Sequence, residues 1–125
     1  MGDTERQEKG KNIIKELQGD MVKDEIFPLL EEEFPDFLKV LTEEHLFGEV
    51  WSRPGLSLRD RCMITLSILI AFRFEDELKA HIRYSLNAGL SKEEILEIIL
   101  HTANYTCWGS GVEATRMAED IFSSR

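Results

Sequence analysis

Residues 48–94 read GEVWSRPGLSLRDRCMITLSILIAFRFEDELKAHIRYSLNAGLSKEE and contain the signals that decide the fold. Ser57 is typical of a helix N-cap, and the residues after it are apolar on nearly every side of a helix from Leu58 to about Phe72. A second helical pattern begins at Glu75 and stops at Asn87-Ala88-Gly89. A helix that is apolar all round needs partners on every side, and a chain of 125 residues is too short to supply them alone. Oligomerisation is therefore expected.

Helical spacing also dominates the rest of the chain. Ser91-Lys92-Glu93-Glu94 is a capping box, and Pro28 and Pro35 each disfavour helical continuation from the residue before them. The sequence shows no repeat, no alternating strand pattern and no low-complexity tract. We predict an all-α fold, an orthogonal bundle in one domain over residues 1–125. The other expected helices are 7–17, a short helix after Pro28, 36–47 ended by Gly48, 75–88, 92 to about 105, and a last helix after the break at Gly109-Ser110-Gly111 that ends near Phe122.

The composition disfavours several classes of partner. With 15 basic and 24 acidic residues the net charge is -9, which opposes binding to nucleic acid phosphates and to anionic membrane surfaces. The first residues are charged and give no secretory signal, and the apolar run 63–72 is far shorter than the roughly 20 residues that cross a bilayer. Cys62 and Cys107 lie outside any Cys-x-x-Cys or zinc spacing. A cytoplasmic protein without nucleic acid or membrane partners is expected.

His81 is the first candidate for chemistry. It lies one turn after Glu77 and beside the apolar stripe of its predicted helix, at the edge of the buried face. An imidazole in such a position can give or take a proton. The alternative is a half-buried histidine whose nitrogens bond to Glu77 or to a backbone carbonyl, and spacing alone favours that alternative.

Three arginines surround the turn and the helix start that precede His81: Arg53, Arg59 and Arg61. Planar guanidinium groups can hold a carboxylate through two parallel hydrogen bonds, but exposed ion pairs to Glu49 or Asp60 explain these arginines equally well. Glu49 lies two residues before Trp51. Burial against that indole would raise the pKa of Glu49 into a range useful for proton transfer; alternatively, its carboxylate orients Arg53.

Tyr105, Cys107 and Trp108 come just before the glycine break and could line a pocket. A free cysteine is more often a small hydrophobic residue, and the two aromatic side chains have the same ambiguity. No two of the 3 histidines share a predicted helix at ligand spacing, so we expect neither zinc nor iron.

Short motifs follow one another from Gly48 to Tyr105, and in this order they resemble the carboxymuconolactone decarboxylase family of the AhpD-like superfamily. Residues 48–105 form the core motif region, and residues 1–45 match loosely. The resemblance implies an all-helical, AhpD-like bundle that assembles as a homo-trimer or homo-hexamer. The motifs are Gly48-Glu49-Val50-Trp51, Arg53-Pro54-Gly55-Leu56-Ser57, Arg59-Asp60-Arg61, Glu77-Leu78, His81, Asn87-x-Gly89-Leu90-Ser91 and Glu93-Glu94-Ile95.

The resemblance also implies a chemistry: loss of CO2 from 4-carboxymuconolactone without a cofactor, through a dienolate, to give 3-oxoadipate enol-lactone. His81 would be the proton donor, matching the family's histidine, and Arg53 and Arg61 would hold a carboxylate or the lactone oxygen. Glu49 would position an arginine or relay a proton. The substrate contacts would be completed by Trp51, Tyr105 and Trp108. The expected partner is a small carboxylated lactone or a related organic acid.

Two other functions stay open at this point. The peroxidase branch of the superfamily resembles Cys-x-x-Cys-x-x-x-His, but the two cysteine positions before His81 hold Phe74 and Glu77, so only an unrelated thiol geometry could support alkylhydroperoxidase activity. A helical oligomer that binds a small acid without turnover would also explain the arginines. Thr106 to Gly111 departs from the alanine, glycine and proline usual in the family and leaves the exact substrate open.

Overall fold

The computed structural model describes residues 4–22, 25 and 35–124, and every regular element in that part of the chain is a helix. The predicted all-α class is confirmed there. The short helix predicted after Pro28 lies outside the described residues. In chain order the helices are α1 (Thr4–Gln18), α2 (Asp36–Val40), the π-helix η3 (Leu41–Val50), α3 (Leu58–Phe72), α4 (Glu75–Asn87), α5 (Lys92–Tyr105) and α6 (Trp108–Ser123).

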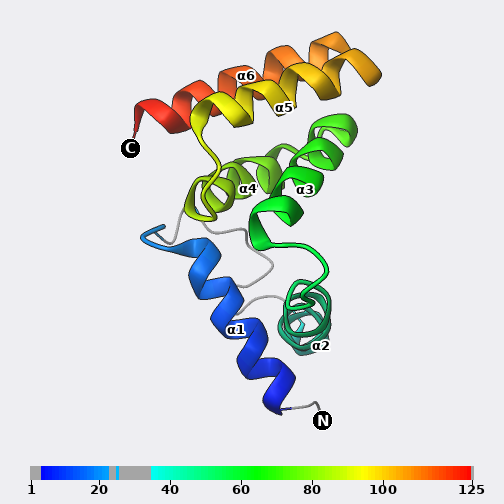
Figure 1. Ribbon diagram of the computed structural model, residues 1–125, viewed down its shortest axis with the longest axis vertical. Helices are drawn as coiled ribbons and strands as arrows, with labels where there is room; N and C mark the ends of the chain where they lie inside the picture. Colours follow the sequence, from blue (N-terminus) through cyan, green and yellow to red (C-terminus); the bar gives the residue numbers. More distant parts are fainter. Residues whose placement is uncertain (1–3, 23–24, 26–34, 125) are drawn as a thin grey trace.

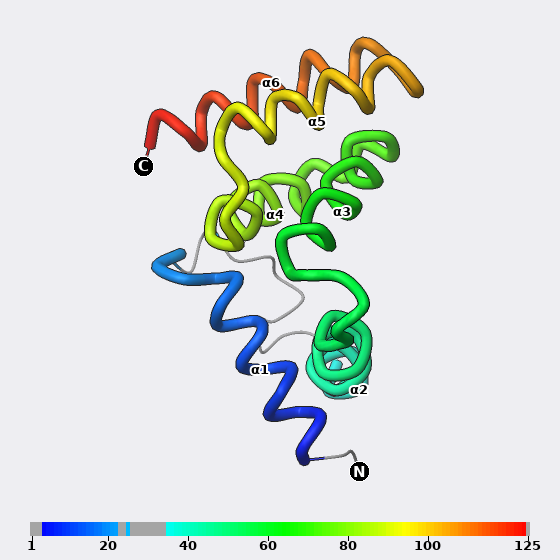
Figure 2. The backbone as a smooth tube through the Cα atoms, viewed as in Figure 1, coloured from blue at the N-terminus to red at the C-terminus, as the bar shows by residue number. Residues whose placement is uncertain are grey.

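The helices form three tiers along the long axis of the molecule (Figure 1). The helix pair α5 and α6 lies at one end, α3 and α4 pack together in the middle, and α1 packs against η3 at the other end. A loop over residues 51–57 leads from the end of η3 into α3 (Figure 2). The core runs through all three tiers, because side chains from each helix pair are buried. Those with the least exposure are Leu17, Cys62, Leu66, Ile70, Ile82 and Ile95.

The cap signals placed the starts of α3 and α5 correctly. The Ser57 hydroxyl accepts a hydrogen bond from the backbone N–H of Asp60 at 3.0 Å, so α3 begins where its N-cap predicted. At the start of α5 both hydrogen bonds of the capping box form, from Glu94 N–H to Ser91 Oγ at 3.0 Å and from Ser91 N–H to Glu94 Oε1 at 2.9 Å. The helix α4 ends at Asn87, one residue before the predicted end.

The predicted end of the 36–47 helix at Gly48 is wrong. The chain stays helical to Val50, with π-type winding from Leu41. Gly48 is an interior residue whose hydrogen faces α1, and a Cβ there would lie 2.1 Å from the carbonyl oxygen of Arg6. Gly10 is its counterpart in α1, where a Cβ would lie 1.7 Å from the Glu43 carbonyl oxygen. The two glycines therefore serve a close helix contact rather than helix ends.

The predicted break at Gly109-Ser110-Gly111 is also wrong, because α6 already begins at Trp108. The interruption lies at Thr106 and Cys107, and Cys107 is the extended N-cap residue. Gly111 is buried in the first turns of α6, and a Cβ there would lie 2.7 Å from the Cβ of Ala103 in α5. Gly111 therefore allows α5 and α6 to pack closely.

The helix α3 keeps an apolar stripe at its surface. Ile64, Ile68 and Phe72, each four residues apart, are 49%, 47% and 68% exposed, so the chain alone leaves one side of this helix uncovered. Among the described helices none is long and apolar enough to cross a membrane.

Candidate active site

The side chain of His81 lies on α4 between two aromatic rings. The ring centroid of Trp51, at the end of η3, is 6.3 Å from the imidazole, and the ring of Tyr84 meets it edge-on at 4.9 Å. Tyr84 and Trp51 are both buried. The loop after η3 and one turn of α4 thus enclose the imidazole in a largely apolar environment.

The imidazole is desolvated and incompletely bonded. Its Nδ1 atom is buried and has no hydrogen-bond partner among the described residues. Burial lowers the pKa of His81 to about 4, because a charged ring would lose its hydration. Glu77, which was the expected partner in the alternative interpretation, has a raised pKa from its own partial burial. An unsatisfied buried nitrogen is costly, so this site favours a bound ligand with a hydrogen-bonding group.

Arg53 and Arg61 are brought together by the loop geometry. The Arg61 guanidinium donates a hydrogen bond from Nη2 to the backbone carbonyl of Arg53 at 3.1 Å, while its Nε is buried without a hydrogen-bond partner in the described chain. The Arg53 side chain is exposed. Arg61 therefore fixes the loop that carries Arg53 and still has a free donor.

A cavity of about 450 Å³ lies between α1 and this loop. Trp51 and Arg53 line it from the loop, and Lys9, Asn12 and Glu16 line it from α1. His81 is not among the residues that line this cavity, but the Trp51 ring, which does line it, lies 6.3 Å from the imidazole. The volume lies within the range of small-ligand sites.

Glu49 lies in a different environment from the one expected. Its carboxylate accepts a hydrogen bond of 2.5 Å from Arg6 of α1 and lies 3.6 Å from Nδ1 of His45. The side chain is exposed, and the Arg6 hydrogen bond lowers the pKa of Glu49. The expectation that Trp51 buries Glu49 and raises its pKa is therefore wrong, because a partner 43 residues away in sequence takes the carboxylate.

Tyr105 and Trp108 lie apart from the His81 site. Tyr105 is 81% exposed and lines a groove with Ile68 and Phe72 at the far end of α3. Trp108 lines an apolar groove of about 370 Å³ between α5 and α6. Within one chain these two aromatic residues are not brought to His81.

Arg59, the third arginine of this region, forms an ion pair with Glu94 at the start of α5.

The described residues contain no group of three or more His, Cys, Asp or Glu side chains able to hold a metal ion.

The two cysteines are free and differ in environment. Burial raises the pKa of the Cys62 thiol to about 11. Cys107 is exposed at the N-terminus of α6, and hydrogen bonds from the Ser110 and Gly109 backbone lower its pKa. Arg73 adds a donor at 3.5 Å from the Cys107 sulfur. Neither thiol adjoins His81 in a dithiol arrangement.

Sequence reasoning missed Tyr84 and the residues of α1 in this region. Tyr84 follows His81 by three residues, a spacing that places both on one helix face and that could have indicated their contact. No local pattern indicates Lys9 or Asn12, since their place beside Trp51 depends on the packing of α1 against η3.

The comparisons with known proteins agree with the motifs. The chain matches the model of the carboxymuconolactone decarboxylase family over residues 35–120. It is 34% identical over 122 residues to 4-carboxymuconolactone decarboxylase of Acinetobacter baylyi, an alignment that covers 98% of this chain and 90% of that protein. It is also 39% identical over 74 residues to the nitrosuccinic acid decarboxylase npaB of Metarhizium robertsii, covering 59% of this chain and 52% of that relative. Both relatives are decarboxylases, which confirms the predicted carboxy-lyase class. The chain belongs to the carboxymuconolactone decarboxylase family.

Proposed function

We propose that this protein is a cofactor-independent decarboxylase that converts 4-carboxymuconolactone into 3-oxoadipate enol-lactone and CO2. The observation that carries the proposal is the buried Nδ1 of His81, which has no hydrogen-bond partner among the described residues, near Trp51, a residue that lines a cavity together with Arg53. The similarity to 4-carboxymuconolactone decarboxylase over nearly the whole chain supports the choice of substrate. The nitrosuccinic acid decarboxylase shows that relatives of this chain also accept an open-chain acid.

The reaction needs no electron acceptor. The bond between the ring carbon and its carboxylate breaks, CO2 leaves, and the electron pair moves through the conjugated double bond onto the lactone carbonyl. The resulting dienolate takes one proton at the carbon next to that carbonyl, which restores a neutral lactone. Stabilisation of the dienolate oxygen and delivery of that proton are the two tasks of the protein.

His81 is the proposed proton donor. Because its pKa is about 4 in the free protein, the imidazole is neutral near pH 7. A bound substrate carries negative carboxylates, which favour the charged imidazolium and raise this pKa. His81 thus takes up a proton together with the substrate and gives it to the dienolate.

The arginines and Trp51 complete the proposed site. Arg53 holds a substrate carboxylate, and Arg61 holds the Arg53 loop and offers its free Nε to a substrate oxygen. The Trp51 indole supplies an apolar wall that favours the loss of charge when CO2 departs. Glu49 acts as a positioning residue, since its carboxylate holds Arg6 and so helps to fix α1.

We also propose that the protein is a homo-trimer or homo-hexamer in the cytoplasm. The uncovered stripe of Ile64, Ile68 and Phe72 supports association, because it leaves a continuous apolar face on α3. A contribution of Tyr105 and Trp108 to substrate binding requires a neighbouring copy of the chain. The exposed, unpaired thiol of Cys107 fits a reducing compartment. Sizing chromatography with light scattering tests the assembly, and a monomer would contradict it.

The central test follows the ultraviolet spectrum of 4-carboxymuconolactone with the wild-type protein and with His81→Asn. Loss of a general acid predicts a fall in kcat of about 100-fold or more. His101→Asn is the control for loss of an imidazole, because His101 is exposed on α5 and does not line the cavity beside Trp51. Since His101 lies 5.1 Å from Tyr105 and beside Ile68 and Phe72, sizing chromatography must show that this variant keeps the wild-type assembly. Full turnover by His81→Asn would contradict the proposed role.

The same assay separates the alternatives. A thiol peroxidase predicts loss of hydroperoxide reduction in Cys107→Ser with lactone turnover absent throughout. A small-acid binding protein predicts ligand binding that survives His81→Asn, with no turnover of the lactone or of nitrosuccinate.

A further inference from the structure

We propose that Lys9 of α1 is a second carboxylate anchor, which makes the cavity beside Trp51 selective for acids with two carboxylate groups. The inference rests on the proposed function for its natural substrate, but ligand selectivity can be measured without turnover. Residues 35–120 carry the family match, so Lys9 is a specificity-determining residue from outside that region.

The α1 side of the cavity is one helix face. Lys9, Asn12 and Glu16 are spaced by three and four residues, which places them in a row along the helix, and all three line the cavity together with Trp51 and Arg53. Lys9 and Arg53 therefore line the same cavity from two different segments, α1 and the loop over residues 51–57.

Both cations are available to a ligand. Among the described residues neither Lys9 nor Arg53 has an ion-pair partner, whereas Arg6, Arg59 and Arg73 each have at least one. Two unpaired cations that line one cavity match the two negative ends of a dicarboxylate.

Glu16 makes the two ends of the α1 face of this cavity differ in charge. It lies seven residues after Lys9, about 10 Å further along α1, and its carboxylate repels an anion from that end of the cavity. A dianion is therefore favoured at the Lys9 end of the α1 face.

The backbone of Lys9 is held firmly. Its neighbour Gly10 packs so closely on η3 that a Cβ would lie 1.7 Å from the Glu43 carbonyl oxygen. One turn earlier, Arg6 bonds to Glu49 at 2.5 Å. A binding group on a fixed helix loses less freedom when a ligand binds than one on a mobile loop.

Decarboxylation chemistry supplies the reason for an anchor on the carboxylate that the substrate keeps. A cation on the departing carboxylate stabilises the ground state, and that stabilisation is lost when neutral CO2 forms. A cation on the retained carboxylate holds the substrate equally before and after the reaction. Both 4-carboxymuconolactone and nitrosuccinate have one carboxylate to lose and one to keep, so an anchor for the retained group suits this reaction.

The experiment compares succinate, an unreactive dicarboxylate, with its monoamide succinamate. Isothermal titration calorimetry measures both affinities with Trp108 left in place, because Trp108 is itself a proposed substrate contact. Lys9→Gln is expected to raise the Kd for succinate about fivefold, the size expected for an exposed ion pair, with less than about a twofold change for succinamate.

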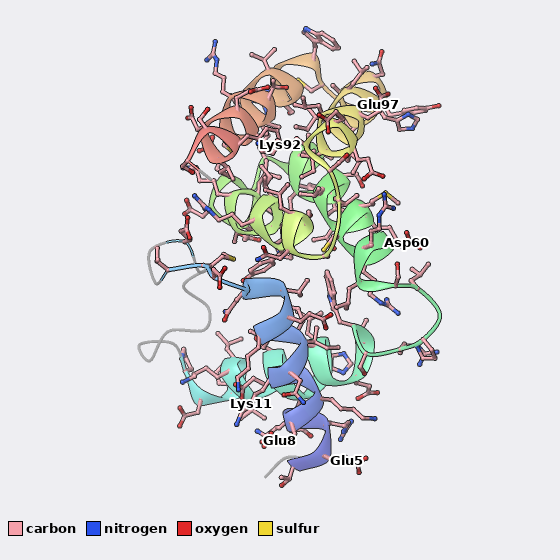
Figure 3. All side chains as sticks on the ribbon, turned by 60° about the vertical axis from the view of Figure 1, so that its left-hand side comes forward. Glu5, Glu8, Lys11, Asp60, Lys92 and Glu97 are labelled. Carbon is pink, nitrogen blue, oxygen red and sulfur yellow. The ribbon has the colours of Figure 1, made fainter. Side chains whose placement is uncertain are left out.

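Lys11→Gln is the matched control. Lys11 is exposed on the same helix, labelled with Glu8 in Figure 3, and does not line the cavity, but its replacement removes the same charge. It should leave both affinities unchanged, while Lys9→Arg should restore succinate binding and Glu16→Gln should tighten it. The KM for 4-carboxymuconolactone should follow the Kd for succinate.

Each outcome decides the question. The proposal is overturned if the wild-type protein does not prefer succinate, if Lys9→Gln behaves like Lys11→Gln, or if it weakens both probes equally. A protein that prefers succinate through Lys9 but turns over neither 4-carboxymuconolactone nor nitrosuccinate would support the Lys9 anchor and contradict the proposed decarboxylation.

Discussion

Arg6 of α1 donates a hydrogen bond of 2.5 Å to Glu49 of η3, joining the N-terminal helix to the segment that ends at Trp51. Arg6 also contacts Glu44 at 3.2 Å, and His45 lies 3.6 Å from the Glu49 carboxylate. Because Arg6 and His45 contact the Glu49 carboxylate, Glu49 is suited to holding α1 in place rather than to contacting the substrate.

We expect Glu49→Gln to raise the KM about twofold, as for a weakened exposed ion pair, and to leave kcat unchanged. The effect should fade at high ionic strength because salt screens exposed charges. Steady-state kinetics at two salt concentrations measures both features. A fall in kcat of more than about tenfold would instead assign Glu49 to proton transfer.

The contact between Gly48 and α1 should tolerate no larger side chain. A Cβ at Gly48 would lie 2.1 Å from a backbone carbonyl, and we expect Gly48→Ala to destabilise the fold by about 1–3 kcal/mol through overpacking. Gly55→Ala is the control, because a Cβ there meets nothing within 4 Å. Urea unfolding of both variants checks the difference, and equal stabilities would refute the close contact.

Acid should destabilise the protein through His81. In the unfolded chain the imidazole has its ordinary pKa near 6.5, whereas burial lowers the pKa to about 4 in the fold. The unfolded state therefore binds a proton first as the pH falls, and stability drops between about pH 6.5 and 4 by at most about 3 kcal/mol. Above pH 6.5 this residue contributes no pH dependence.

Urea unfolding at several pH values, with His81→Gln and His101→Gln side by side, measures that contribution. The His81 variant should lose less stability on acidification than the wild type. The His101 variant should follow the wild-type curve, since His101 is exposed. Parallel curves for all three proteins would mean that His81 is not desolvated.

The two thiols should differ sharply in reactivity. Cys107 is exposed with a lowered pKa, and Cys62 is buried with its pKa raised to about 11. A disulfide reagent should therefore modify one thiol per native chain quickly and the second only in denaturant. Arg73→Met should slow the fast phase, because Arg73 donates to the Cys107 sulfur. Two fast thiols in the native protein would contradict the burial of Cys62.

Local signals predicted α3, α4 and α5 well because caps act within a few residues. Ser57 and the Ser91-Glu94 box form the hydrogen bonds expected of them. The ordered motifs identified the family. In the structure His81 lies near Trp51 and Arg61 bonds to the Arg53 carbonyl, while the roles of these residues stay predictions.

The errors came from partners that are distant in sequence. Local sequence predicts a helix end at Gly48, but in the structure this glycine packs against the Arg6 carbonyl. Local sequence also predicts a buried carboxyl at Glu49, but the Arg6 side chain binds it at the surface. The lining of the cavity by α1 depends on the same tertiary contact. Each of these features is decided by how α1 meets η3, which no local pattern encodes.

The π-type winding of η3 determines the direction in which the Trp51 side chain leaves the end of the helix. A π-turn accommodates an additional residue relative to an α-turn, so the side chains that follow it are rotated about the helix axis. Rewinding Leu41–Val50 as an α-helix of the same length would turn the emerging Trp51 about the helix axis. The indole would then leave His81, although every residue of the site would still be present. Substitutions that favour α-winding over π-winding in this segment should therefore reduce activity even where they replace no residue of the site.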